Sequence, residues 1–199
     1  MRVVFLDRDG VINKFPGHGN YVTHLRDFYF LPGALKAIKQ LTTAGCAIFV
    51  VSNQAGVGRG LFPKENLKEI TDHMLTQVQK TGGDIQKVFY CIHPSEKNCD
   101  CRKPRIGSLK KAFRLVRQKT PAPLEGYFVG DAKMDIEAGR TAGCTTILVL
   151  SGKETRRTIR DWVIQPDYIA KNLLGAIKII LNENSRYPRL RRRRTHAGR

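Results

Sequence analysis

Short apolar runs that end in acidic or polar residues restrict the possible folds of this chain more than any other feature. The segments between them carry apolar residues at helical spacing, and proline or glycine marks most of their ends. Alternating strands and helices predict an α/β fold, a doubly wound parallel sheet with helices on both faces. The expected strands cover residues 3–6, 47–51, 88–92, 127–129, 145–150 and, at one edge, 167–170. The expected helices cover about residues 33–44, 63–82, 107–119, 133–142 and 173–181.

Acidic and hydroxyl side chains follow several of these strands. Asp7 and Asp9 come after the first strand, Ser52 ends the second, and Asp131 and Asp135 follow the fourth. Because ligands of an open parallel sheet bind beyond the carboxyl ends of its strands, these residues are expected to meet at one edge. Acids gathered there repel each other unless a cation lies among them, and oxygen ligands favour a hard ion such as Mg²⁺.

The spacing of Asp7 and Asp9 allows the two carboxylates to take different roles. Asp7 is placed to attack as a nucleophile, and Asp9 is placed to give or take a proton at the leaving oxygen. A turn with capping side chains after a strand also explains the pair when it is taken alone.

Four motifs in order resemble the haloacid dehalogenase (HAD) superfamily of phosphatases, which use an aspartate nucleophile. They are DxDG at residues 7–10, a serine at the end of the second strand, a lysine after the third, and GDxxxD at residues 130–135. The resemblance covers about residues 3–150 and implies a Rossmann-like HAD core that hydrolyses phosphate monoesters. It implies a phospho-aspartate on Asp7 and acid/base catalysis by Asp9. It also implies that Mg²⁺ is held by Asp7, the backbone carbonyl of Asp9 and Asp131.

The same resemblance assigns the phosphoryl oxygens to Ser52 and Lys103. Such contacts suit phosphoryl transfer, because charge spread over three oxygens needs positioned donors and cations. The resemblance further implies that Asp135 orients the lysine and does not bind the metal directly. From the residues alone, Ser52 is also explained as a turn hydroxyl, Lys103 as a solvated charge and Asp135 as a helix cap.

A cysteine-rich loop is the second chemical signal. An odd number of cysteines, five, in a chain without an export signal argues against a disulfide framework. CxH and CxC motifs lie within eleven residues, and a set of three thiolates and one imidazole completes a closed, structural Zn²⁺ site formed by Cys91, His93, Cys99 and Cys101. The spacing is tighter than in common zinc fingers, so a reduced, metal-free loop stays as an alternative. Cys46 and Cys144 stand at strand starts and are expected to be buried free thiols.

The zinc loop, at about residues 91–101, ends two residues before Lys103. Together with CRKP at residues 101–104, it narrows the resemblance to the D-glycero-D-manno-heptose 1,7-bisphosphate 7-phosphatases and the related bacterial histidinol-phosphate phosphatases. Two departures from that subgroup are a longer loop at residues 14–21 and a shorter segment between His93 and Cys99. A zinc clamp here is expected to place Arg102 and Lys103 over the crevice.

The short spacing between the motifs leaves no room for a separate cap domain, so loops are expected to close the crevice over a small phosphorylated sugar. The predicted substrate-binding residues are Asn20, Tyr21, Asn53, Gln54 and Arg102. The fork of Arg102 can bind a second phosphate, which favours the heptose bisphosphate over histidinol phosphate as the substrate, and a solvated cation stays as the alternative for this residue. The predicted activity is therefore removal of the 7-phosphate of the heptose bisphosphate, and a histidinol-phosphate phosphatase is the alternative.

The net charge of +18 is concentrated in part at the carboxyl terminus, where seven arginines and no acid follow residue 185. This charge leaves open a nucleic-acid 3′-end phosphatase or a polyanion-binding protein that uses the arginine tail. We expect one domain over residues 1–183 and a basic, disordered tail over residues 184–199. With neither a signal peptide nor a membrane span, a cytoplasmic monomer is expected.

Overall fold

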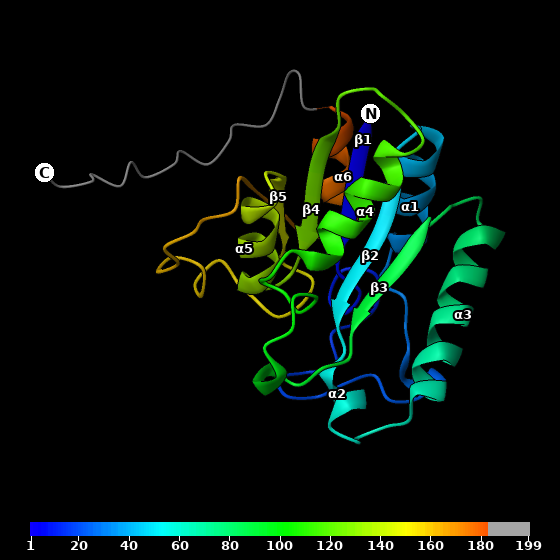
Figure 1. Cartoon of the computed structure of the whole chain (residues 1–199), viewed down its shortest axis with the longest axis vertical. Coiled ribbons are helices and arrows are strands. Elements are labelled where there is room, and N and C mark those ends of the chain that lie inside the picture. The colour runs from blue at the N-terminus through cyan, green and yellow to red at the C-terminus, as the bar shows by residue number, and fades with distance from the viewer. Residues whose placement is uncertain (183–199) are drawn as a thin grey trace, which may run out of the picture.

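The computed structural model describes residues 1–182, and a single parallel sheet with the strand order β3-β2-β1-β4-β5-β6 runs through them (Figure 1). Its strands are β1 (Arg2–Leu6), β2 (Ala47–Asn53), β3 (Lys87–Cys91), β4 (Glu125–Gly130), β5 (Thr145–Val149) and β6 (Tyr168–Ala170). The helices are α1 (Ala34–Thr43), α2 (Ala55–Gly58), α3 (Lys64–Lys80), α4 (Gly107–Arg117), α5 (Lys133–Thr141) and α6 (Leu173–Leu181). The basic tail predicted at residues 184–199 lies outside the described residues.

The two faces of the sheet are covered by different helices because successive strand residues point to opposite sides. In β1, Val4 and Leu6 pack with α1, α3 and α6, whereas Val3 and Phe5 pack with α4 and α5. Side chains on both faces are fully buried, which is why the strands are continuous apolar runs in the sequence. The predicted doubly wound α/β fold is confirmed.

Every helix and strand predicted from the sequence is present, with ends shifted by a few residues. The short helix α2 was not predicted, because four residues containing two glycines show no helical periodicity. Its glycines serve close packing, since a Cβ at Gly58 would lie 2.2 Å from the carbonyl oxygen of Ile92. Helix α2 therefore fits directly against the segment that follows β3.

No helix within residues 1–182 has the length and apolar character needed to cross a membrane.

The strand order places the reversal of the sheet between β1 and β4. Strands β1 and β4 pair in parallel, and the chain builds outward from them in opposite directions. Open α/β sheets bind ligands in the crevice at such a switch point. Asp7 follows β1 and Asp131 follows β4, so the fold brings both acids to the two sides of this crevice. Loops and short helices lie over this edge in the described part of the chain, so the prediction of a core without a separate cap domain is confirmed.

Candidate active site

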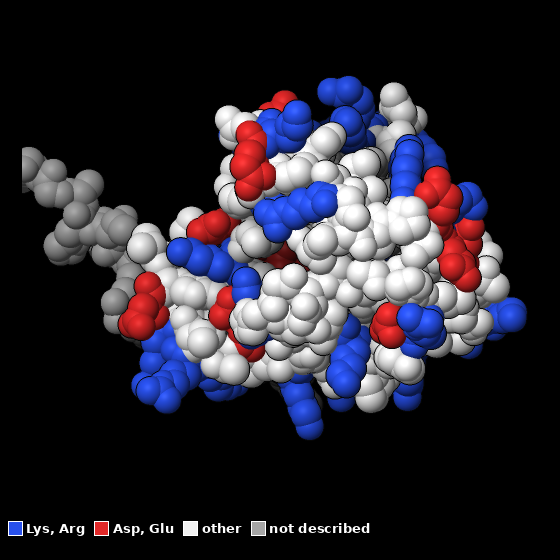
Figure 2. Space-filling view, turned by 90° about the horizontal axis from the view of Figure 1, so that it is seen from below, with Lys and Arg blue, Asp and Glu red and all other residues white. Residues whose placement is uncertain are grey.

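A cluster of buried carboxylates and one lysine occupies the carboxyl edge of the sheet. Asp7, Asp131 and Asp135 each place a carboxylate oxygen within 4.8 Å of the others. Lys103 Nζ lies 2.9 Å from Asp7 Oδ1 and 2.7 Å from Asp135 Oδ1, and it donates to the carbonyl oxygen of Val51 at 2.7 Å. Figure 2 shows this end of the molecule, where acidic atoms lie at the floor of a hollow with lysine and arginine side chains around it.

The environment of this cluster shifts the pKa values of its side chains. Burial by itself lowers the pKa of Lys103, but Asp135 and Asp7 outweigh it and raise the pKa above the ordinary value, so the lysine stays charged. Burial, helped by repulsion from Asp7, raises the pKa of Asp135 to about 6 against the opposing attraction of Lys103. Burial and the charges of Asp7 and Asp135 raise the pKa of Asp131 well above its usual range. One lysine therefore does not neutralise three carboxylates.

Asp131 is the acid that this lysine does not contact. Its Oδ2 accepts the backbone N–H of Lys153 at 2.7 Å, and the salt bridges of the described residues give it no cationic partner. The donor set of Asp7 and Asp131 is oxygen only and carries excess negative charge, which fits a hard divalent cation such as Mg²⁺. Asp135 contacts the lysine at 2.7 Å.

Two glycines form the wall behind Asp131. A Cβ at Gly152 would lie 2.0 Å from Asp131 Oδ2, and a Cβ at Gly10 would lie 2.2 Å from the same atom. Gly10 also has φ +80°, a conformation that favours glycine. The motif glycine after Asp9 and a distant loop glycine thus both make room for the carboxylate. Sequence reasoning missed Gly152, because its partner is 21 positions away in the chain.

A Gly152→Ala substitution is expected to weaken Mg²⁺ binding about 10- to 100-fold, because the added methyl group displaces the Asp131 carboxylate. The measurement is the Mg²⁺ concentration that gives half-maximal activity, together with thermal unfolding. Gly175→Ala is the matched control, since its Cβ meets Ala170 and Asn172 only at ordinary distances of 3.5 and 3.7 Å. If the Mg²⁺ dependence of the Gly152→Ala variant were unchanged, Asp131 would not be a ligand of the metal.

Asp9 is held by side chains on three sides. The guanidinium of Arg8, fully buried, donates through Nε and Nη2 to Oδ1 at 3.1 and 2.9 Å and through Nη2 to Oδ2 at 3.0 Å. Asn13 Nδ2 donates to Oδ1 at 2.8 Å, and Gln54 Nε2 donates to Oδ2 at 2.9 Å. Gln54 Nε2 also lies 3.2 Å from Ser52 Oγ, so it joins the predicted acid/base to the predicted phosphoryl-binding serine.

Three of these residues differ from expectation. The sequence predicts substrate binding for Gln54, but its side chain is fully buried and its amide donates to Asp9 and Ser52. The sequence gives no role to Arg8, which lies inside the DxDG segment, or to Asn13, which lies three residues after its glycine. A charged residue next to a catalytic acid gives no sign of its burial, since arginines are seldom fully buried unless paired.

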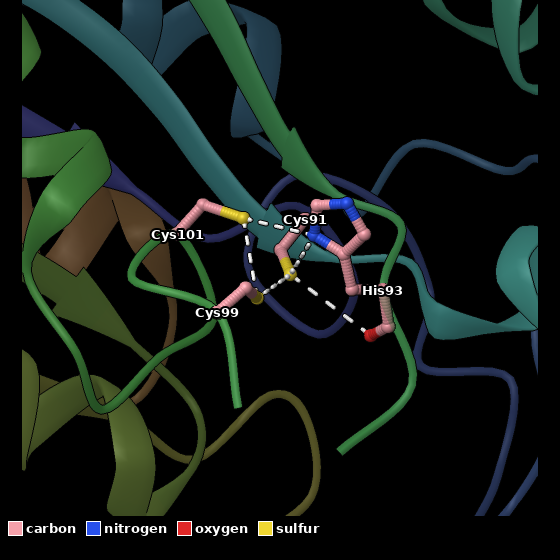
Figure 3. Close-up of side chains that lie close together, drawn as sticks. All are labelled: Cys91, His93, Cys99 and Cys101. Atoms are coloured by element: carbon pink, nitrogen blue, oxygen red, sulfur yellow. Dashed lines mark hydrogen bonds between the residues drawn. The ribbon is translucent and has the colours of Figure 1, made fainter. Parts of the chain in front are cut away.

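The four predicted zinc ligands converge on one point (Figure 3). The Sγ atoms of Cys91 and Cys101 each lie 3.4 Å from Cys99 Sγ, and His93 Nδ1 lies 3.3 Å from Cys101 Sγ and 3.9 Å from Cys91 Sγ. A tetrahedron with ligand distances of about 2.3 Å has edges of about 3.8 Å. The side chains therefore fit a four-coordinate Zn²⁺ ion.

The thiols of this cluster influence each other strongly. Burial, with hydrogen bonds to Cys101 and Cys99, raises the pKa of Cys91 to about 12. Burial opposes ionisation of Cys99, yet hydrogen bonds from Cys101, Cys91 and His93 lower its pKa to about 6. A cluster in which one thiolate is already stabilised and the others are close is suited to a cation that ionises all three. Cys46 and Cys144 are buried free thiols, as expected.

The segment after the cysteine cluster reaches the active site through Lys103. Its backbone N–H donates to Asn53 Oδ1 at 3.1 Å, and its carbonyl accepts from Asn53 Nδ2 at the same distance. Asn53, predicted to bind substrate, therefore holds the backbone of the lysine. Arg102 is half-buried, and its Nη1 makes a long contact of 3.5 Å to the carbonyl oxygen of His93.

The predicted sugar-binding residues line a separate depression of about 480 Å³. Asn20 and Tyr21 lie there with Phe15 and Tyr29, and Lys14 forms part of the same wall. This wall adjoins the acid/base network, because the carbonyl of Lys14 accepts from the Asn13 amide that also donates to Asp9. The structure thus brings Asn20 and Tyr21 together, next to the Asp9 network.

Comparisons with known proteins show which proteins this chain is similar to. A model of the HAD-hydrolase-like family matches residues 100–176. D-glycero-beta-D-manno-heptose-1,7-bisphosphate 7-phosphatase of Pseudomonas putida is 38% identical over 91% of this chain and all of the relative. The enzyme of that name from Pasteurella multocida is 32% identical over 90% of this chain and 96% of the relative.

A solved structure gives the same result. The crystal structure of D,D-heptose 1,7-bisphosphate phosphatase from B. bronchiseptica, complexed with magnesium and phosphate, superposes with a TM-score of 0.81. It is 32% identical in sequence, and the match covers 92% of this chain and 99% of that one.

Proposed function

The chain belongs to the D,D-heptose 1,7-bisphosphate 7-phosphatase family of HAD hydrolases, and we propose that it removes the 7-phosphate of D-glycero-D-manno-heptose 1,7-bisphosphate. The observation that carries the proposal is the arrangement of Asp7, Asp131 and Lys103 at the switch point of the sheet. This arrangement supplies a nucleophile, a place for a divalent cation and a fixed positive charge. Phosphoryl transfer needs these three parts more than it needs covalent assistance.

The first chemical step uses Asp7 as the nucleophile. Its Oδ1 already accepts from the backbone N–H of Arg8 at 2.7 Å and from Lys103, so we assign the attack to Oδ2. A bond forms between Oδ2 and phosphorus while the bond from phosphorus to the sugar oxygen breaks. The electron pair of that bond stays on the sugar oxygen, which takes a proton from Asp9.

The second step returns the enzyme to its starting state. A water oxygen attacks phosphorus, the bond to Asp7 breaks, and its electron pair returns to the carboxylate. Asp9 accepts the proton that the water loses. Lys103 and Ser52 hold the phosphoryl oxygens in both steps. Asp7, Asp131 and the backbone carbonyl of Asp9 would hold Mg²⁺, which would supply charge neutralisation when bound.

The sugar-binding residues are proposed from their placement. Tyr21 packs near α2, since a Cβ at Gly56 would lie 3.0 Å from its ring, and Gly56 is two residues after Gln54. The amide of Asn20 and the phenol of Tyr21 can bond sugar hydroxyls in the depression that they line. Arg102 lies beside Lys103, and its single long contact leaves the guanidinium available for a second phosphate.

A substrate panel tests this assignment. We expect kcat/KM for phosphate release from heptose 1,7-bisphosphate to exceed that for histidinol phosphate by at least about tenfold. Both anomers of the sugar and a 3′-phosphorylated oligonucleotide complete the panel, each measured with and without residues 186–199. A preference for histidinol phosphate would favour the related phosphatase activity instead. Loss of activity on the oligonucleotide alone, after removal of the tail, would favour a nucleic-acid substrate.

We also propose that Cys91, His93, Cys99 and Cys101 hold one structural Zn²⁺ ion, which leaves no open position for substrate.

A further inference from the structure

We propose that Gln54 and Arg8 are positioning residues that hold the Asp9 carboxylate for proton transfer, and that Gln54 links this carboxylate to the phosphoryl-binding serine. The proposal rests on the function assigned above, because it needs Asp9 to act as the acid and base. The sequence predicts substrate binding for Gln54, and it predicts no role for Arg8.

Hydrogen bonds from neighbouring side chains fix the orientation of the Asp9 carboxylate. Both carboxylate oxygens accept from side chains that are themselves buried, and the Asp9 side chain is only 16% exposed. The paired donors of the Arg8 fork fix the plane of the carboxylate, because Nη2 reaches both oxygens at 2.9 and 3.0 Å. The guanidinium is in turn held 5.7 Å from the centre of the Tyr90 ring, whose hydroxyl accepts from Thr71 Oγ1 at 3.0 Å.

Three buried polar atoms around Asp9 have no hydrogen-bond partner among the described residues. They are Arg8 Nη1, Asn13 Oδ1 and Gln54 Oε1. Each belongs to a side chain whose other end donates to Asp9. A buried polar atom without a partner destabilises the fold, so a sequence selected for stability alone would favour an apolar side chain at position 54. The amide is therefore best explained by what its donor end does.

The donor end of Gln54 connects two parts of the reaction. Its Nε2 lies 2.9 Å from Asp9 Oδ2 and 3.2 Å from Ser52 Oγ. Ser52 Oγ accepts from Gln54, which leaves the serine O–H free to donate to a phosphoryl oxygen. A chain of polar groups then runs from the phosphoryl group through Ser52 and Gln54 to Asp9, and such chains strengthen cooperatively in a buried site.

Gln54→Met separates this role from a structural one. Methionine has a similar length, removes the donor to Asp9 and also removes the unpaired Oε1, so the melting temperature is expected to stay within about 4 °C of the wild type. We expect kcat/KM for the sugar bisphosphate to fall about 10- to 100-fold. The ratio of kcat/KM for the sugar bisphosphate to kcat/KM for p-nitrophenyl phosphate is expected to fall at least about tenfold, because nitrophenolate leaves without a proton.

Pre-steady-state kinetics with p-nitrophenyl phosphate add an independent readout. The first step, which does not need the acid, stays fast, whereas hydrolysis of the phospho-aspartate needs Asp9 as the base and slows. A burst of nitrophenol equal to the enzyme concentration is therefore expected in Gln54→Met. Arg8→Lys keeps the positive charge but lacks the paired fork, so the substrate ratio should fall there too.

Two controls keep the outcomes distinct. Gln79→Met changes an exposed glutamine at the far end of α3 and should leave the substrate ratio at the wild-type value. Asp9→Asn is expected to abolish turnover of the sugar bisphosphate, and a fully active Asp9→Asn enzyme would overturn the proposed reaction itself. If Asp9→Asn is inactive but Gln54→Met shows no change, or an equal loss on both substrates, then the positioning role alone is wrong.

Discussion

An Asp7→Asn variant is expected to lose about 10⁴-fold or more in kcat on the sugar bisphosphate while keeping its fold. The asparagine amide is not a nucleophile, so no phosphoenzyme forms. Its Oδ1 still accepts the N–H of Arg8, and Lys103 keeps its 2.7 Å contact with Asp135, so the local structure has little reason to rearrange. Phosphate release measures the rate, and acid quenching with labelled substrate measures the phosphoprotein.

Asp84→Asn makes the same chemical change at an exposed position after α3 and serves as the control. It should form phosphoenzyme and release phosphate at the wild-type rate. Labelled protein in the Asp7→Asn variant would place the nucleophile elsewhere. Full-speed hydrolysis without any labelled protein would instead indicate direct attack by water, and the covalent mechanism would have to be abandoned.

The positions of the acids proposed for catalysis were predictable because local sequence determines their surroundings. Each follows an apolar run that is buried on both faces, and strand ends in a parallel sheet converge on one edge. The order of β1, β2 and β4 along the chain was therefore enough to bring Asp7, Ser52 and Asp131 together. The cysteine cluster was predictable for a similar reason, since its four residues lie within eleven positions of one another.

The residues that orient those acids could not be predicted, because contacts distant in sequence determine them. Arg8 is buried under Tyr90 of β3, and nothing near Arg8 in the sequence shows this. Gln54 reaches Asp9 across 45 positions, and Gly152 reaches Asp131 across a helix and a strand. The type of a side chain predicts which chemistry it can perform, whereas contacts between residues distant in the sequence decide which partner it has.

The loop between β3 and α4 has almost no apolar support of its own. None of residues 92–102 is buried, yet Lys103 immediately after them is 2% exposed and sits between two carboxylates. Backbone bonds from Gly58 to Ile92 and from Gly107 to Asp100 hold the loop near its ends, and the Arg105 side chain donates to the carbonyls of Asn98 and Cys99. A metal bound by Cys91, His93, Cys99 and Cys101 would supply the stabilisation that burial does not, because binding free energy at such sites becomes folding free energy.

A Cys99→Ser/Cys101→Ser variant is therefore expected to lose its zinc and about 100-fold in kcat/KM on the sugar bisphosphate. Zinc content measured on the purified protein should fall from one per chain to none. The Mg²⁺ concentration for half-maximal activity should stay near the wild-type value, because Asp7 and Asp131 are fixed by β1 and β4 and not by the loop. Cys46→Ser is the control, because it changes a buried thiol directly before β2. This variant should keep both zinc and activity.

The pattern of loss identifies which residue the clamp positions. If displacement of Lys103 dominates, kcat falls, because this lysine lies 2.9 Å from the proposed nucleophile and is proposed to hold the transferring group. If displacement of Arg102 dominates, KM rises while kcat is retained, because a second phosphate is bound equally in the ground and transition states. Asn53 still holds the lysine backbone through two hydrogen bonds, so a zinc-free protein with wild-type kcat/KM would mean that this anchor suffices and that the metal has no part in placing either residue.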